Sequence, residues 1–145
     1  MGVNKMTEEE IQDIKELIKK ELVRTKEDIN RGVLESVKDL KKIITIEDGT
    51  GRIIILDKNN FKNMEKIEIL MMGKYIAHIA EIINNPDADI QAISTELSIP
   101  KTTLSAPLGE LVKKNILHKK EGQYRFNEAF MKEELQKILG GVENE

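Results

Sequence analysis

The side chains best suited to bind a ligand are cations that gather toward the C-terminal end of this 145-residue chain. Between Ser98 and Asn127 stand six of them, Lys101, Lys113, Lys114, Lys119, Lys120 and Arg125, against two acids, Glu110 and Glu121. That stretch is locally positive, although the whole chain has a formal net charge of −3 and the flanking segments 61–97 and 128–145 are both acidic. Clustered lysines can displace the counterions condensed on nucleic-acid phosphates. The alternative is a solvated lysine-rich face that binds nothing.

Apolar residues recur at helical spacing in and just before this positive stretch. The first set, which precedes Ser98, is Ile90, Ile93 and Leu97; the second set, within the stretch, is Leu104, Leu108, Leu111 and Val112. They predict a short helix, for which Asp87 or Asp89 is the N-cap, and a second helix over residues 101–115. Ser98-Ile99-Pro100 predicts a tight turn between the two. Two short helices joined by three or four residues have helix-turn-helix spacing.

A β-hairpin is expected next, because Tyr124 and Phe126 alternate with polar neighbours after the turn residues Glu121-Gly122. A last helix is expected from its cap, Asn127, to Leu139. Helix, helix, turn, helix and hairpin is the order of the winged helix-turn-helix fold. The stretch IQAISTELSIPKTTLSAPLGELVKKNIL, followed by HKKEGQYRF, resembles the core of archaeal and bacterial winged-helix transcription regulators. The resemblance covers residues 66–127.

The resemblance implies a DNA-binding protein whose second helix enters the major groove and whose hairpin, the wing, holds phosphates. By position, the helix residues are Lys101, Thr102, Thr103, Ser105, Ala106, Gly109 and Lys113, and the wing residues are Lys119, Lys120 and Arg125. This helix face departs from that of a strong base reader, since it offers hydroxyls, Ala106, Pro107 and Gly109 where Arg, Asn or Gln would contact base edges. Two functions therefore stay open: a dimeric regulator that binds double-stranded DNA, and a winged-helix module that binds proteins without DNA.

The N-terminal part predicts a separate module over residues 1–62. Thr7 and Glu10 form a capping box, and apolar residues follow at steps of three or four as far as Leu40. Gly32 weakens the middle of this run, so the sequence leaves two alternatives open: one long helix, or two helices that divide at Gly32. Such a long stripe exceeds what a small neighbouring domain can cover. We therefore expect it to dimerise the chain through Ile11, Ile14, Ile18 and Leu22; the alternative is a solvated helix packed on its own domain.

Isoleucine runs on both sides of Asp48-Gly49 predict a β-hairpin within residues 43–57. A strand rather than a helix follows these glycines, so they are not a phosphate loop. Residues 64–84 predict a helix that is apolar nearly all round and joins the two halves. One of Asn59, Asn60 or Asn63 is its expected cap. The expected fold is mainly α with small β-hairpins: an N-terminal long helix plus hairpin, a winged helix-turn-helix domain over 63–140, and a disordered tail over 141–145.

Catalysis is not expected of this sequence. The chain has no cysteine and only two histidines, His78 and His118, which excludes disulfides, thiolate metal sites, thiol nucleophiles and a histidine cluster. We expect no enzyme activity, no cofactor and no metal. The longest apolar runs are too short for a membrane span, and the N-terminus lacks the apolar segment of a signal peptide, so a cytoplasmic protein is expected. The sequence identifies no small-molecule effector.

Overall fold

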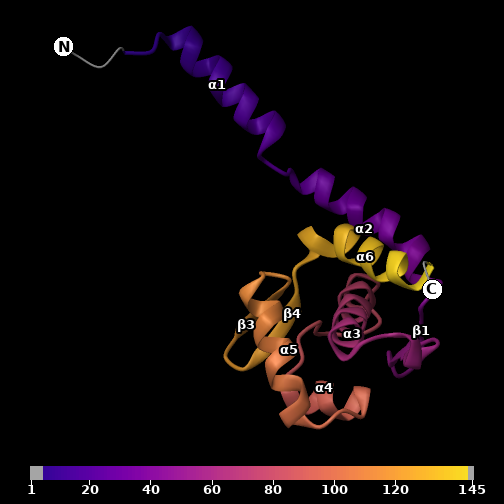
Figure 1. Cartoon of the computed structure of the whole chain (residues 1–145). Helices are drawn as coiled ribbons and strands as arrows, with labels where there is room; N and C mark the ends of the chain where they lie inside the picture. The colour runs from indigo at the N-terminus through magenta and orange to yellow at the C-terminus, as the bar shows by residue number, and fades with distance from the viewer. Residues whose placement is uncertain (1–4, 144–145) are drawn as a thin grey trace. The chain divides into compact units, whose positions relative to one another are not determined.

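A computed structural model describes residues 5–143 of the chain (Figure 1). The fold is mainly helical with two small antiparallel sheets, as the sequence predicts. In chain order its elements are α1 (Glu8–Glu21), α2 (Lys26–Leu40), β1 (Ile44–Ile46), β2 (Ile53–Ile55), the 3-10 turn η1 (Lys58–Asn60), α3 (Asn63–Ile79), α4 (Ile90–Leu97), α5 (Lys101–Lys113), β3 (Leu117–Lys120), β4 (Gln123–Phe126), η2 (Glu128–Phe130) and α6 (Met131–Glu143). The chain forms two compact units, Met1–Arg31 and Gly32–Glu145.

The first unit contains α1 and the start of α2. The Thr7 hydroxyl accepts a hydrogen bond from the Glu10 amide at 3.1 Å, which is the predicted start of α1. The long helical run does divide into two, but after Glu21 rather than at Gly32. Thr25 explains the position, because its hydroxyl and the Asp28 carboxylate each accept a hydrogen bond from the other residue's amide and so begin a new helix. Hydrogen bonds from the Thr25 side chain and from the Thr25 amide to the Asp28 carboxylate lower the pKa of Asp28.

The first hairpin belongs to the second unit. β1 and β2 pair with Ile46 opposite Ile53, around the turn that Asp48-Gly49 predicts. Both strands contact α3, and a Cβ on Gly73 of that helix would lie 2.7 Å from Cγ2 of Ile53. This close packing joins the first hairpin to α3 within the second unit. Isoleucine runs identify a hairpin but do not show which helix will cover it.

Helix α3 lies at the centre of the second unit. It contacts β1, β2, α4, α5, β4 and α6, which surround it in Figure 1. Most of its middle turns are buried, as the all-round apolar pattern predicts. The expected asparagine cap is wrong: the helix starts after Lys62, whose amide donates to the Glu65 carboxylate at 2.8 Å. It ends at Ile79 rather than residue 84, because Glu81 has a positive φ of 61°.

Glu68 is a buried acid among the apolar residues in the middle of α3, and the apolar spacing does not predict its burial. Its side chain hydrogen-bonds to Glu134 of α6, which is also buried and pairs with Lys137 at 3.1 Å. Removal from water raises the pKa of Glu68 to about 9, with the hydrogen bond and the negative charge of Glu134 adding to the effect. Glu68 therefore carries its proton at neutral pH. The charged partners around it are Glu65 on its own helix and Glu134 and Lys137 on α6.

The C-terminal helix begins as the sequence predicts and extends further. The Asn127 side chain accepts a hydrogen bond from the Ala129 amide at 3.2 Å and starts η2, from which α6 continues. The expected end at Leu139 is wrong, because α6 runs through Gly140 to Glu143. The disordered tail expected from residue 141 is thus helical as far as 143, and residues 144–145 lie outside the described part of the chain.

Replacing Glu68 by Gln should change how stability depends on pH. A folded-state pKa above the ordinary 4.5 means that the native state holds a proton that the unfolded chain releases. The free energy of unfolding of the wild type should fall as pH rises from about 4.5 to about 9, by up to about 1.4 kcal/mol per pH unit. Urea unfolding across this range should show the fall in wild type and in the exposed control Glu21→Gln. If the free energy of unfolding of Glu68→Gln fell with pH as steeply as that of the wild type, the account would be contradicted.

Two glycine-to-alanine substitutions should have opposite effects on stability. In Gly73→Ala the new Cβ meets Ile53, whose branched side chain has little freedom to move, so we expect a loss of about 1–3 kcal/mol. In Gly109→Ala nothing lies within 4 Å of the added Cβ, and a gain of about 0.5–1 kcal/mol is expected from helix propensity. Thermal unfolding followed by circular dichroism measures both. Equal effects of the two substitutions would be inconsistent with the packing at Gly73.

Candidate nucleic-acid interface

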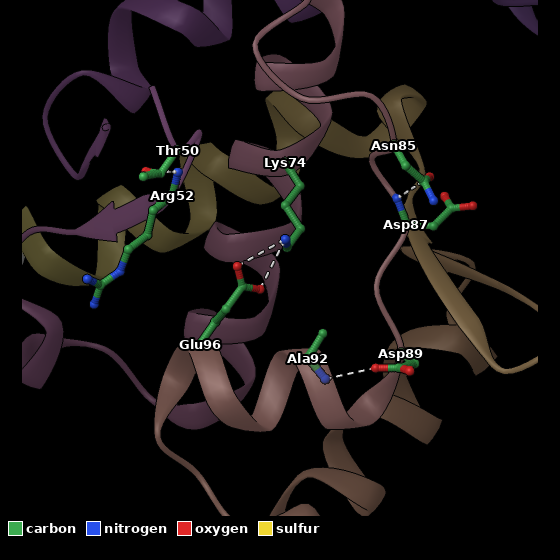
Figure 2. A network of polar contacts seen from close by, with 8 residues as sticks. All are labelled: Thr50, Arg52, Lys74, Asn85, Asp87, Asp89, Ala92 and Glu96. Atoms are coloured by element: carbon green, nitrogen blue, oxygen red, sulfur yellow. Dashed lines mark hydrogen bonds and ion pairs between the residues drawn. The ribbon is translucent and has the colours of Figure 1, made fainter. Parts of the chain in front are cut away.

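The turn between α4 and α5 is built as the sequence predicts. The Asp89 carboxylate accepts a hydrogen bond from the Ala92 amide at 2.8 Å and caps α4 (Figure 2). Ser98 ends this helix with a positive φ of 57°, and the buried Ile99 anchors the turn. Pro100 precedes the first residue of α5, where its missing amide costs no hydrogen bond. The three-residue turn therefore fixes α5 against α4.

Two lysines from outside the turn hold α4 in place. Lys74 of α3 forms an ion pair with Glu96 of α4 at 3.0 Å, with the two side chains only 15% and 28% exposed (Figure 2). Lys58 donates a hydrogen bond to the carbonyl oxygen of Leu97 at 2.5 Å, at the negative end of the α4 dipole. Burial lowers the pKa of Lys58, with Lys66 and Arg52 adding to the effect. Through these contacts, the two lysines fix the position of α4 within the fold.

Helix α5 presents its predicted outer face to solvent. Its buried side is formed by Leu104, Leu108 and Leu111. The residues assigned to the groove by resemblance are all exposed: Lys101, Thr102, Thr103, Ser105, Ala106, Gly109 and Lys113. The Ser105 hydroxyl donates to the Lys101 carbonyl at 3.3 Å, within the helix. Pro107 supplies no amide, so the Thr103 carbonyl lacks the hydrogen bond that residue 107 would otherwise give it.

The second hairpin is closed by a tight turn and is hydrogen-bonded to the segment that precedes α4. Glu121 and Gly122 have φ values of 52° and 78°, the two positive angles of a tight two-residue hairpin turn. Ala88 forms a bridge with Tyr124, with mutual backbone hydrogen bonds of 2.8 Å and 3.0 Å. Tyr124 and Phe126 are buried, which fixes the inner face of the hairpin. Figure 1 shows α5 beside this hairpin, and the two are in contact.

The three predicted wing cations do not share one face of the hairpin. The strand register pairs Lys119 with the buried Tyr124, and Lys119 Nζ lies 5.4 Å from the centre of that ring. Because side chains alternate along a strand, Lys120 and Arg125 lie on the opposite face. On that face is a hollow of about 490 Å³, lined by Asp87, His118, Lys120, Glu121, Gln123 and Arg125.

Two of the six cations already have acid partners. The Arg125 guanidinium binds the Asp87 carboxylate through Nε at 2.5 Å and Nη2 at 3.3 Å, which raises the pKa of Arg125. Lys114 pairs with Glu110 at 3.1 Å along α5. Within the described residues, the lysines of this stretch without an ion-pair partner are Lys101, Lys113, Lys119 and Lys120. The sequence located the positive stretch but could not show that Asp87 would neutralise part of it.

Metal binding and membrane insertion are two other roles that the described residues can be compared with. No group of three or more histidines and acids among these residues is placed to hold a metal ion. No helix over residues 5–143 has both the length and the apolarity needed to cross a membrane. Comparison of the chain with protein-family models, with curated proteins and with solved structures finds no match in any of the three. A functional assignment therefore depends on the geometry of this chain.

Breaking the Lys74–Glu96 pair should destabilise the fold more than breaking an exposed pair. Lys74→Met leaves the poorly exposed Glu96 charge without its partner, so we expect a loss of about 1–3 kcal/mol. The matched control Lys114→Met breaks an exposed pair, with an expected loss below about 1 kcal/mol. A double substitution Lys74→Met/Glu96→Leu should recover part of the first loss. Urea unfolding measures all three; equal losses from the two single substitutions would contradict a positioning role for Lys74.

Proposed function

We propose that residues 63–140 are a winged helix-turn-helix domain that binds double-stranded DNA, and that the chain acts as a dimeric transcription regulator. The observation that carries this proposal is the location of four lysines of the positive stretch that have no acid partner among residues 5–143. Lys101 and Lys113 are on α5, and Lys119 and Lys120 are on β3, two elements in contact within an acidic chain. We propose a cytoplasmic binding protein rather than an enzyme, with no cofactor.

The order of elements supports the domain assignment. Helix α3 is followed by the Ala88 bridge, then α4, a three-residue turn, α5 and the β3–β4 hairpin. In winged-helix proteins the helix after the turn enters the major groove and the hairpin reaches phosphates beside it, as the resemblance implies. In this chain those elements are α5 and the hairpin that carries Lys119 and Lys120.

The chemistry of α5 favours phosphate binding over strong base selection. Lys101 and Lys113 supply charge near the two ends of the helix, whereas residues 105–109 carry no charged or amide side chain. The methyl group of Ala106 suits apolar contact with thymine. Arg125 contributes less to phosphate binding than the sequence indicated, since its guanidinium is paired with Asp87. Affinity should therefore depend steeply on salt and weakly on base sequence.

The uncharged face of α5 also supports a second candidate, a winged-helix module that binds another protein. Ser105, Ala106 and Gly109 are exposed and small, so a partner could approach the helix closely. Ser105→Arg distinguishes the two functions. It should strengthen binding to duplex DNA by adding a charge near the groove, whereas it should disrupt a close protein contact.

The DNA proposal is tested with Lys119→Glu/Lys120→Glu. Fluorescence anisotropy with several unrelated duplexes, over a series of salt concentrations, should show weaker binding by a similar factor for each duplex. The slope of log affinity against log salt should shrink by about 2, because each lost phosphate contact removes about 0.9 of a counterion. The control Lys26→Glu/Lys42→Glu makes the same change in net charge on exposed residues that belong to neither α5 nor the β3–β4 hairpin, and should bind as the wild type does. Unchanged binding by the wing variant removes the wing from the mechanism, and no binding by the wild type at low salt rejects the proposal.

A further inference from the structure

Helix α1 has an apolar stripe that its own residues do not bury. The stripe consists of Ile11, Ile14, Leu17, Ile18 and Leu22, which are between 37% and 78% exposed. α1 is also acidic, with six acids against three lysines over residues 8–21. At 100° per residue, Asp13 lies just beyond the Leu17 edge of the stripe, and Glu21 lies between Leu17 and Ile14. The helix therefore combines an exposed apolar surface with acids on its Leu17 side.

The second unit has a groove with complementary properties. It has a volume of about 420 Å³ and lies between α2, β1 and α3. Its lining is apolar apart from two lysines and a threonine: Val37, Lys38, Leu40, Lys41, Ile44, Thr45, Ile46 and Ile76. Leu40 and Ile44 form a buried floor, and among the described residues no acid lines this α2–β1 groove. Lys38 lies on α2 and Lys41 follows the end of that helix, and the two lysines give the groove a basic side.

We propose that the α2–β1 groove of one chain receives the apolar stripe of α1 from a second copy, with the exchange made in both directions. An amphipathic helix in an apolar groove is a common recognition mode, and reciprocal exchange gives a closed two-fold dimer. Asp13 and Glu21 would face Lys38 and Lys41, so charge selects the orientation of the helix. This inference rests on the dimer in the proposed function and specifies its interface.

A groove suits α1 better than pairing with another α1 would. The helix has 14 residues, which is two heptads, whereas stable coiled coils usually need about three or four heptads. Two isolated helices of this length would each have to be ordered by the other. A groove with a buried floor is already ordered, so only one helix has to be fixed for each contact.

The first experiment measures the mass of the full-length chain by sedimentation equilibrium. Wild type should be a dimer, and Lys38→Glu/Lys41→Glu should raise the dimer dissociation constant by about tenfold or more. The matched control Lys119→Glu/Lys120→Glu has the same change in net charge outside the groove and should remain dimeric. Restoring the dimer by adding Asp13→Lys/Glu21→Lys to the groove variant would show that the two sets of charges meet. Circular dichroism confirms that each variant is folded.

The second experiment distinguishes groove exchange from a coiled coil of two α1 helices. Ile14→Asp/Ile18→Asp spoils α1 and leaves the groove intact, while the groove variant leaves α1 intact. Each should be monomeric alone, and an equimolar mixture should form a heterodimer through one intact contact. Groove variants that dimerise as well as wild type would overturn the inference while leaving a DNA-binding dimer standing. A monomeric wild type would overturn the inference and the dimer together, and binding to duplex DNA is judged separately.

Discussion

Packing around α3 is the constraint on which the rest of the second unit depends. This helix contacts both hairpins, α4, α5 and α6, so each of these elements is positioned by packing against the side chains of α3. Gly73 allows the first hairpin to lie close to α3. The next residue, Lys74, holds α4 through its ion pair with Glu96. Glu68 adds an acid that stays neutral because it is buried against Glu134. The apolar side of α5 packs in this core, so the opposite, polar side of the helix faces solvent.

Much of the second unit could be predicted from sequence because its signals are local. Apolar spacing, the cap at Asp89 and the turn at Ser98–Pro100 each act over a few residues, and the helices and the turn lie where these signals place them. The errors involve signals that compete or act at a distance. Gly32 is a weak helix breaker, and the helix instead restarts at Thr25, where the capping bonds with Asp28 form. α6 likewise continues through Gly140, because a glycine lowers helix propensity without forcing a helix to end.

The candidate site shows the same limit. Charge counting found the positive stretch, but the use of each charge depends on contacts between residues far apart in the chain. Asp87 reaches Arg125 across 38 positions, and Lys74 reaches Glu96 across 22. Strand register separates Lys119 from Lys120, although they are neighbours in sequence. The fold therefore decides which lysines have no acid partner among the described residues, and a count from composition alone overstates their number.

The contact between Gly73 and Ile53 also limits how this sequence can vary. A side chain at position 73 would need the space of the Ile53 methyl groups, so the two positions are coupled through volume. A chain with the same arrangement should pair a glycine at 73 with a branched residue at 53, or a larger residue at 73 with a smaller one at 53. Such compensation would preserve the close approach of the first hairpin to α3 while the residues on the surface vary.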